Sequence, residues 1–365
     1  MYPRIEINLN HIEMNLRKIN EICQSNDIEV AVVTKLVCGH PTIIKVLADI
    51  GVEWLADSRI ENIISYAEIQ SKTMMLRLPM KSQVEDVVRY CSSSLISDVQ
   101  MATLLNDVAL KVNKVHQVIV MVDLGDLREG ILDRNELLLS IKKMKKLPGI
   151  ELLGIGTNLS CFGGVRPTQL LLKQLVDIND TLKQEFDLEL PIVSGGNSGT
   201  LSLLVNEGKL PEGINHLRLG ASVFMGIGLD DRPIPGLRQD TFKLVCEVIE
   251  LRNKPSVPIG DVGLDAFGNK PTFEDKGNIL RCICAIGRQD VSPSDLIPCD
   301  PGIEILGASS DHLLLDVTTS RKSYKIGETV EFNITYAGCL SLMTSVYVSK
   351  KFVHNEIESA FAERS

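Results

Sequence analysis

The feature that most restricts the fold of this sequence is an eightfold alternation of a short apolar run with an amphipathic stretch of helical length. The apolar runs lie at 28–35, 52–58, 73–78, 93–98, 115–123, 150–158, 190–196 and 214–222. Helical candidates between them include 40–50, 99–112 and 166–186. The runs are continuously apolar, which is typical of parallel strands that are buried on both faces.

Eight strand–helix units that close on each other predict an α/β fold, a (β/α)8 TIM barrel, over residues 1–232. From about residue 233 the helical period fades, and apolar segments alternate with Gly, Pro and Asp turns. This second pattern predicts a C-terminal antiparallel β domain over residues 233–365. The run IEINLN near the start of the chain is a candidate strand for pairing with that domain.

Composition limits the partners of the chain. Its 365 residues favour two domains, and its net charge is −9 at pH 7. Nucleic acid and membrane surfaces both require clustered Lys and Arg, so we expect neither as a partner. The start of the chain lacks the pattern of a signal peptide, no apolar stretch approaches a membrane span, and the nine cysteines show neither a zinc spacing nor a disulfide framework. We therefore expect a cytoplasmic protein with reduced thiols and no metal site.

Lys35 is the first candidate for chemistry, because a barrel's active site lies where its strands end at the carboxyl face. Lys35 ends the first apolar run, directly after AVVT. A lysine that ends a buried strand must either extend to solvent or be used. In the second case its desolvated amine would be a good nucleophile toward a carbonyl and would form a Schiff base.

The seventh and eighth runs end in glycines and small, hydroxyl-bearing residues, at 194–200 and 218–222. Backbone amides at the start of a helix bind phosphate well, and barrels commonly bind phosphate after their last two strands. A tight turn would explain either segment alone. Together with Lys35, the two segments indicate pyridoxal 5′-phosphate, held by amides at one end and by the lysine at the other.

Several motifs resemble those of the alanine racemase family, PLP-dependent enzymes of fold type III, and most closely its ornithine racemase branch. The resemblance covers nearly the whole chain. The matching positions are the cofactor-lysine motif AVVTKLVCGH at 31–40, the phosphate-binding pair Asn197 and Ser198, and the Arg-x-Gly-small motif of Arg218, Gly220 and Ala221.

The resemblance implies a role for each matched residue. Lys35 would carry the cofactor, Arg218 would meet the pyridine nitrogen, and Arg128 would help to hold the substrate carboxylate. The implied cofactor-binding residues are Lys35, Asn158, Asn197, Ser198, Gly199, Thr200, Arg218, Gly220, Ala221 and Ser222. The implied catalytic residues are Lys35, Arg128, Asp311 and Asp265.

Asp311 lies in a segment, 307–312, that is similar to one reaching the partner subunit's active site in the family. The resemblance therefore implies a head-to-tail homodimer with shared active sites. Plainer interpretations stay open, namely a surface ion pair for Arg128 and an ordinary strand-end acid for Asp311.

The sequence also departs from the family. Cys38 stands about where the family has a tyrosine, and Asn158 stands where it has a histidine against the cofactor ring. The family's second catalytic base, a β-domain tyrosine, has no match, and the corresponding loop, 255–269, supplies Asp261 and Asp265. The second base is left unassigned, with the β-domain acids as candidates. Less aromatic bulk and more carboxylates favour a longer, basic substrate side chain.

We therefore predict an isomerase, a racemase in which Lys35 removes or returns the α-proton of the cofactor-bound amino acid on one face. Ornithine is the first expectation, and lysine, arginine and alanine stay open. One alternative is a PLP-dependent basic amino-acid decarboxylase of the same fold, which Arg218 disfavours because a guanidinium at the pyridine nitrogen weakens the electron sink. The other is a non-enzymatic PLP-binding protein involved in cofactor homeostasis, which the β domain disfavours, since such proteins are single barrels.

Overall fold

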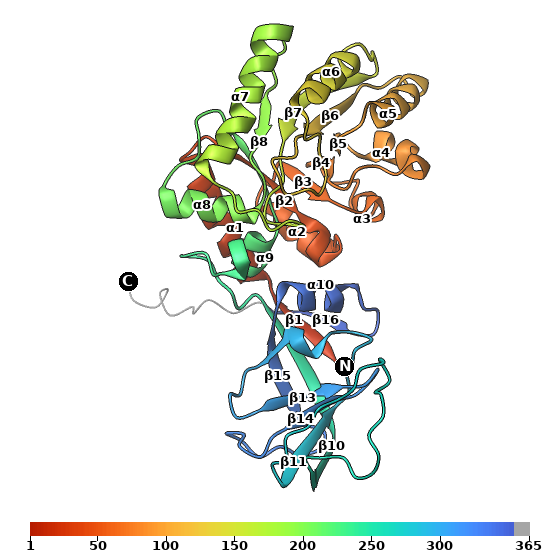
Figure 1. Cartoon of the computed structure of the whole chain (residues 1–365), viewed down its shortest axis with the longest axis vertical. Helices are drawn as coiled ribbons and strands as arrows, with labels where there is room; N and C mark the ends of the chain where they lie inside the picture. Colours follow the sequence, from red (N-terminus) through yellow and green to blue (C-terminus); the bar gives the residue numbers. More distant parts are fainter. Residues whose placement is uncertain (354–365) are drawn as a thin grey trace, which may run out of the picture. The chain divides into compact units, whose positions relative to one another are not determined.

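The computed structural model describes residues 1–353, and the chain divides into two compact units (Figure 1). One unit runs from His11 to Gln239. The other combines Met1–Asn10 with the chain from Asp240 onward, so the division falls later than the boundary after residue 232 that the sequence suggested. Among the described residues, no helix has the length and apolar character needed to cross a bilayer.

The first unit contains a closed barrel of eight parallel strands, which confirms the predicted fold class. Its strands are β2 (Glu29–Val33), β3 (Trp54–Asp57), β4 (Lys72–Met75), β5 (Ser93–Ile96), β6 (His116–Met121), β7 (Ile150–Gly156), β8 (Ile192–Ser194) and β9 (His216–Leu219). Parallel pairing of β9 with β2 closes the barrel. A cluster of buried side chains from these strands, including Trp54, Met74, Ile119 and Ile192, forms its apolar core.

Helices lie around the barrel strands (Figure 1). They are α1 (Leu9–Gln24), α2 (Pro41–Asp49), α3 (Ile60–Ser65), α4 (Val84–Tyr90), α5 (Val99–Lys111), α6 (Arg134–Met144), α7 (Gln169–Phe186), α8 (Ser198–Glu207) and α9 (Ala221–Met225). Short 3-10 turns are η1 (Thr34–Val37), η2 (Lys81–Gln83) and η3 (Leu229–Asp231). Side-chain caps begin several helices where the sequence places Asp or Thr, as at Asp98, Asp133 and Thr168.

The second unit is an antiparallel β domain with strand order β12-β15-β10-β11-β14-β13. The strands are β10 (Phe242–Pro255), β11 (Asn278–Cys284), β12 (Leu296–Pro298), β13 (Glu304–Ala308), β14 (Leu313–Asp316) and β15 (Thr329–Ile334), with η4 (Pro293–Asp295) before β12. β1 (Arg4–Asn8) pairs with β10 and, in parallel, with β16 (Ser349–Val353). The sequence did not indicate α1 or α10 (Tyr336–Thr344).

The prediction that Lys35 ends the first strand was wrong, because the strand ends before this residue. β2 ends at Val33, and Lys35 lies in the η1 turn that follows. The turn closes because the amides of Cys38 and Gly39 donate to the carbonyls of Lys35 and Thr34, and both residues adopt left-handed φ values of 52° and 57°. The strand therefore ends where the 3-10 turn begins, and the two left-handed residues end that turn.

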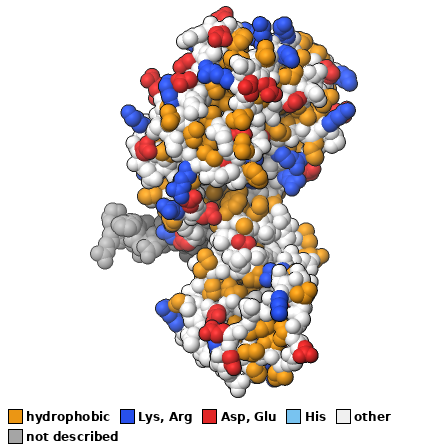
Figure 2. Space-filling model, in the orientation of Figure 1, with side chains coloured by type: hydrophobic (Ala, Val, Ile, Leu, Met, Phe, Trp, Pro, Cys, Tyr) orange, Lys and Arg blue, Asp and Glu red, His pale blue; other side chains and the backbone are white. Residues whose placement is uncertain are grey.

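Charged side chains of both signs are interspersed over the face of the molecule that Figure 2 shows. On this face, Lys and Arg side chains lie among Asp and Glu side chains and do not gather into one broad basic patch.

Candidate active site

Lys35 lies just past the carboxyl end of β2, where a barrel places its chemistry. Its side chain is partly buried, and its Nζ has no hydrogen bond or ion pair within residues 1–353. Burial lowers the pKa of Lys35, and the positive charge of Arg128 lowers it further. A lysine with a lowered pKa is neutral more often near pH 7 and is therefore a better nucleophile and base.

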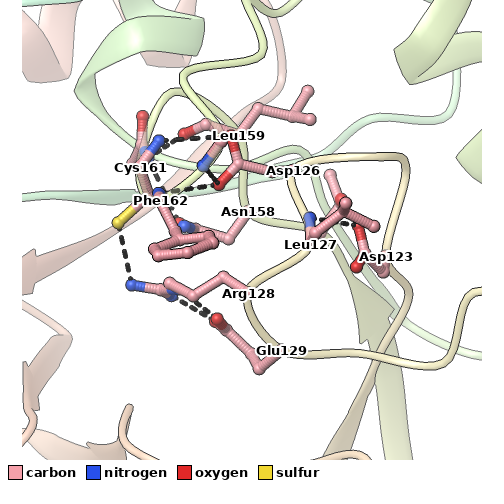
Figure 3. Close-up of polar contacts among 12 residues, drawn as sticks. Asp123, Asp126, Leu127, Arg128, Glu129, Asn158, Leu159, Cys161 and Phe162 are labelled. Carbon is pink, nitrogen blue, oxygen red and sulfur yellow. Dashed lines mark hydrogen bonds and ion pairs between the residues drawn. The ribbon is translucent and has the colours of Figure 1, made fainter.

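Arg128 lies on the loop after β6, with its guanidinium between Glu129 and Cys161 (Figure 3). Nε and Nη2 donate to the two carboxylate oxygens of Glu129, and Nη1 lies 3.1 Å from the Sγ of Cys161. Burial opposes the positive charge, but Glu129 outweighs it and raises the pKa of Arg128. The surface ion pair left open by the sequence is therefore present, and the guanidinium is also close enough to Lys35 to act on its charge.

Asp126 joins the loop after β6 to the loop after β7. Its side chain is fully buried and accepts four backbone amides, drawn in part in Figure 3. The donors are the N–H groups of Cys161, Phe162, Gly163 and Val165, at 3.3, 2.9, 3.2 and 3.0 Å. This clasp sets the position of Cys161 against Arg128. Reasoning from the sequence singled out neither Asp126 nor Glu129, although both acids flank the arginine in VDLGDLREG.

Arg218 lies on β9 and is almost fully buried. Nη1 donates to the Ser194 hydroxyl of β8, and Nη2 donates to the Thr157 carbonyl at 2.7 Å. Ser194 in turn lies 2.8 Å from Nδ1 of His216. Burial first, and then Arg218, lowers the pKa of His216 to about 3, so His216 is neutral.

Burial lowers the pKa of Arg218 to about 10, which still leaves the guanidinium protonated at neutral pH. Gly156 provides room for this group. A Cβ there would lie 3.4 Å from Nη1 of Arg218 and 3.2 Å from the Cβ of Ser194. The predicted buried cation at the end of β9 is thus enclosed by the adjacent strands.

The residues predicted to bind phosphate divide into two groups. Asn197 caps α8 by accepting from the amide of Gly199 at 2.9 Å, and both donors of Thr200 bond to backbone carbonyls. The hydroxyls of Ser198 and Ser222 instead lie 3.0 Å from each other. One proton joins these two oxygens, so the other is left to donate to a ligand.

Two buried donors at the end of β7 lack partners among the described residues. They are Nδ2 of Asn158 and Oγ1 of Thr157. The Oδ1 of Asn158 accepts from Asn197 at 3.2 Å, which holds the amide in place. Buried donors without partners are uncommon, and they point to a ligand or water that supplies acceptors.

The predicted acids of the β domain lie in the other unit from Lys35. Asp265 accepts from the amides of Phe267 and Asn269 at 2.9 and 2.8 Å. These two hydrogen bonds close a turn at 265–269. The hydrogen bond from the Asn269 amide lowers the pKa of Asp265, so its carboxylate is a weak base. Asp311 is exposed between β13 and β14, and Asp261 is exposed in the loop before β11.

Comparisons with known proteins give a consistent result. Residues 7–227 match the family model described as alanine racemase, N-terminal domain. A curated ornithine racemase from Acetoanaerobium sticklandii is 46% identical over 97% of this chain and 100% of its own length. A lysine racemase from Thermotoga maritima is 40% identical over 96% of this chain and 99% of its own.

Solved structures show the same fold at lower identity. An alanine racemase from Clostridium difficile has a TM-score of 0.77 and 18% identity, with 97% of this chain and 96% of that chain covered. The alanine racemase of Bacillus anthracis, with bound L-Ala-P, has a TM-score of 0.73 and 17% identity over 97% and 95% of the two chains. The pairing of a parallel barrel with an antiparallel β domain is therefore shared with these proteins.

Proposed function

The chain belongs to the alanine racemase family, and from that premise we propose that it racemises a basic amino acid, ornithine first, with pyridoxal 5′-phosphate as its cofactor. The observation that carries this proposal is the juxtaposition of Lys35 and Arg128 at the carboxyl end of the barrel, in a chain similar over its length to an ornithine racemase and a lysine racemase.

The residues present fit this cofactor. Asn158 and Thr157 offer buried donors without partners, and the Ser198–Ser222 pair has one hydroxyl proton to give. At Gly220 a Cβ would lie 3.2 Å from both the Cβ and the carbonyl oxygen of Val33, so glycine allows this turn to approach the end of β2 closely. A surface with several hydrogen-bond donors and an accessible backbone turn suits a phosphate group and a polar ring.

Each residue has a proposed part in holding the cofactor. Lys35 would bind it covalently, Arg218 would face its ring nitrogen, and Asn158 would donate to one of its oxygen atoms. Ser198, Ser222 and the backbone at 220–221 would hold the phosphate, while Thr200 and the Gly199 amide brace the turn beside it. When bound, the cofactor supplies delocalisation of the electron pair left at the substrate's α-carbon.

The chain's own groups would move the proton. Lys35, with its lowered pKa, accepts the α-proton at Nζ on one face and can return it. Arg128 binds the substrate carboxylate, and Glu129 holds the guanidinium in a fixed direction by accepting two of its hydrogen bonds. Arg218 keeps its charge, so it disfavours protonation of a ring nitrogen placed against it.

Arg218 also argues against the decarboxylase alternative. Loss of CO2 requires a strong electron sink, and a protonated ring nitrogen facing a carboxylate provides one. Here the buried group on β9 is a cation, and its immediate polar neighbours are a hydroxyl, a carbonyl and a neutral histidine. The proposed site therefore suits reversible proton transfer.

We further propose that two copies of the chain form a head-to-tail homodimer in which Asp311 of one subunit reaches the site of the other. The exposure of Asp311, on a turn between β13 and β14, supports a role toward a second molecule. Asp265 is a poorer candidate for the second base, because its carboxylate is committed to its own turn.

The test is a comparison of kcat/KM for ornithine, lysine, arginine and alanine, each supplied as one enantiomer to the chain loaded with pyridoxal 5′-phosphate and followed by chiral chromatography. We expect ornithine or lysine to exceed alanine by about a hundredfold, the discrimination that a desolvated ammonium–carboxylate contact supplies. Alanine as the best substrate would overturn the substrate proposal, and loss of CO2 would overturn the reaction.

A further inference from the structure

Behind the turn that carries Lys35 lies a buried polar cluster formed by Thr34, Asp57, Asn62 and Tyr66. Asp57 ends β3 and is fully buried, and it makes no ion pair among the described residues. Burial raises the pKa of Asp57, and hydrogen bonds from Thr34, Arg59 and Asn62 act against that rise. Its Oδ2 accepts from the Thr34 hydroxyl at 2.7 Å. Its Oδ1 accepts from the Arg59 amide at 2.8 Å and from Nδ2 of Asn62 at 3.1 Å.

The hydrogen bonds of this cluster have one consistent direction. Thr34 has a single hydroxyl proton, and the Asp57 carboxylate at 2.7 Å is a closer acceptor than the Ala56 carbonyl at 3.3 Å. With that proton given to Asp57, the Tyr66 hydroxyl, 3.2 Å away, donates to Thr34. The chain of donation therefore runs from Tyr66 through Thr34 to the carboxylate. Because a buried carboxylate that loses a donor is costly, each member fixes the position of the next.

The other end of the turn, at Gly39, packs against Asn62 and Tyr66. Gly39 has a left-handed φ of 57°, and a Cβ there would lie 3.0 Å from both the Cβ of Asn62 and the Cε1 of Tyr66. Thr34 therefore holds the start of the turn against Asp57, at the end of β3. Gly39 holds its end against Asn62 of α3 and against Tyr66, the residue after α3. Lys35 lies between these two contacts, which restrict the position of its backbone.

We propose that Asp57 is a positioning residue for Lys35, acting through the Thr34 hydroxyl to fix the turn that aims the lysine amine. The inference rests on the proposed function, in which Lys35 holds the cofactor and moves the proton. Proton transfer depends on distance and direction at the ångström scale, so a turn that is free to shift would slow the reaction without abolishing binding.

The charge of Asp57 acts on Lys35 as well. The charged and titratable groups that face the amine are Arg128, which lowers the pKa of Lys35 after burial has done so, and Cys161, Asp57 and Glu129, which raise it. Removing the negative charge of Asp57 should therefore lower the pKa of Lys35. A carboxylate whose charge does not reach the amine would leave that pKa unchanged.

The first experiment compares Thr34→Val, which keeps the shape of the side chain but removes the hydroxyl, with Thr34→Ser, which keeps the hydroxyl. Thr73→Val is the control, because it removes a buried hydroxyl on β4 that bonds to the Tyr90 carbonyl. In the loaded enzyme we expect kcat for ornithine to fall by about tenfold to a hundredfold in Thr34→Val, with KM changed less than about twofold. Thr34→Ser and Thr73→Val should stay within about threefold of the unmodified chain.

The second experiment measures a property other than activity. Trinitrobenzenesulfonate labels neutral amines, and peptide mass spectrometry of the cofactor-free full chain gives the pH at which Lys35 is half labelled. We expect that pH to fall in Asp57→Asn and to stay constant in Thr73→Val. If Asp57→Asn does not fold, the Thr34→Val and Thr34→Ser pair still decides the question.

A normal kcat in Thr34→Val would overturn the inference, as would an unchanged labelling pH in a folded Asp57→Asn chain. Borohydride reduction of the unmodified loaded chain, followed by peptide mapping, separates this failure from failure of the proposed function. Fixation of the cofactor at a lysine other than Lys35 would remove the proposed function itself. Fixation at Lys35, together with a normal kcat in Thr34→Val and an unchanged labelling pH in Asp57→Asn, would exclude only the positioning role of Asp57.

Discussion

At the scale of single residues, the proposed chemistry depends on two basic side chains, Lys35 and Arg128, that act on each other's charge. Lys35 lies near Arg128, and burial and this neighbour both disfavour its charged form. Glu129 acts in the opposite sense, because it accepts two hydrogen bonds from Arg128 and partly neutralises it. In the proposed mechanism, Arg128 is the fixed cation that binds the substrate carboxylate, and Lys35 is the amine that can change charge.

The lowered pKa of Lys35 has a consequence for stability. The pKa of Lys35 is lower in the folded chain than in the unfolded chain, so its charged form destabilises the fold. This destabilisation is complete below the folded-state pKa and disappears as the pH rises past the ordinary lysine pKa. In the cofactor-free chain, Lys35→Met should therefore raise the melting temperature at pH 7, with the gain narrowing as pH rises toward about 10.5. Thermal melts across pH check this, and a gain that grows with pH would contradict it.

Glu129 should affect catalysis more than an ordinary surface acid does. Its side chain is only 11% exposed and holds Arg128 with both oxygens. In Glu129→Gln we expect kcat/KM for ornithine to fall by about tenfold, because the guanidinium loses its fixed direction. The matched control is Glu53→Gln, which breaks an exposed pair with Lys72 and should change kcat/KM less than about twofold. Equal effects of the two variants would refute the assigned role.

At the scale of elements, the periodicity of the sequence was enough to predict the barrel and the β domain, because eight buried parallel strands and a later change of period have few other solutions. The exact place of Lys35 was not predictable. It depends on left-handed residues at Cys38 and Gly39 and on contacts with Asn62 and Tyr66, which are distant in sequence and invisible to a local pattern.

The same distinction applies to the site. Lys35 and the glycine-rich ends of β8 and β9 were indicated by their place after apolar runs, and Arg218 was indicated by the resemblance to the family's motif. The clasp of Asp126 on the loop after β7 joins residues that are more than 30 positions apart, so no spacing could reveal it. The helices α1 and α10 were also not predicted from the sequence.

The turn between β9 and α9 gives an element-scale prediction. Gly220→Ala places a Cβ 3.2 Å from Val33, at the end of the strand before Lys35, so the two segments must separate by a few tenths of an ångström. We expect pyridoxal 5′-phosphate affinity to fall by about tenfold while the melting temperature changes little. Gly263→Ala is the control, since its Cβ would meet nothing within 4 Å. Unchanged affinity with a lower melting temperature would show that Gly220 serves only packing.

At the scale of the whole molecule, the proposed homodimer makes the β domain part of the chemistry. Asp311 belongs to the unit that does not contain Lys35. If each site combines the barrel of one subunit with the β domain of the other, two different inactive chains can rebuild one working site in a mixed dimer.

Mixing Lys35→Ala with Asp311→Asn chains, after dissociation and reassociation, tests this arrangement. Half of the dimers should be mixed and each should hold one intact site, so about a quarter of the unmodified activity should return. The control mixes Lys35→Ala with Lys35→Met, which leaves no intact site. Absence of recovery, when Asp311→Asn alone is inactive and mixed dimers are present, would exclude shared sites.

The central claim is that this chain interconverts enantiomers through Lys35. The most direct measurement follows the enantiomeric composition of ornithine with time, starting from pure L and from pure D substrate, in the loaded chain and in Lys35→Ala. Enantiomers have equal free energy, so we predict that both starting solutions converge on equal amounts of L and D with no loss of ornithine, and that Lys35→Ala leaves both unchanged. Persistence of a single enantiomer in the unmodified chain, or convergence in Lys35→Ala, would contradict the account.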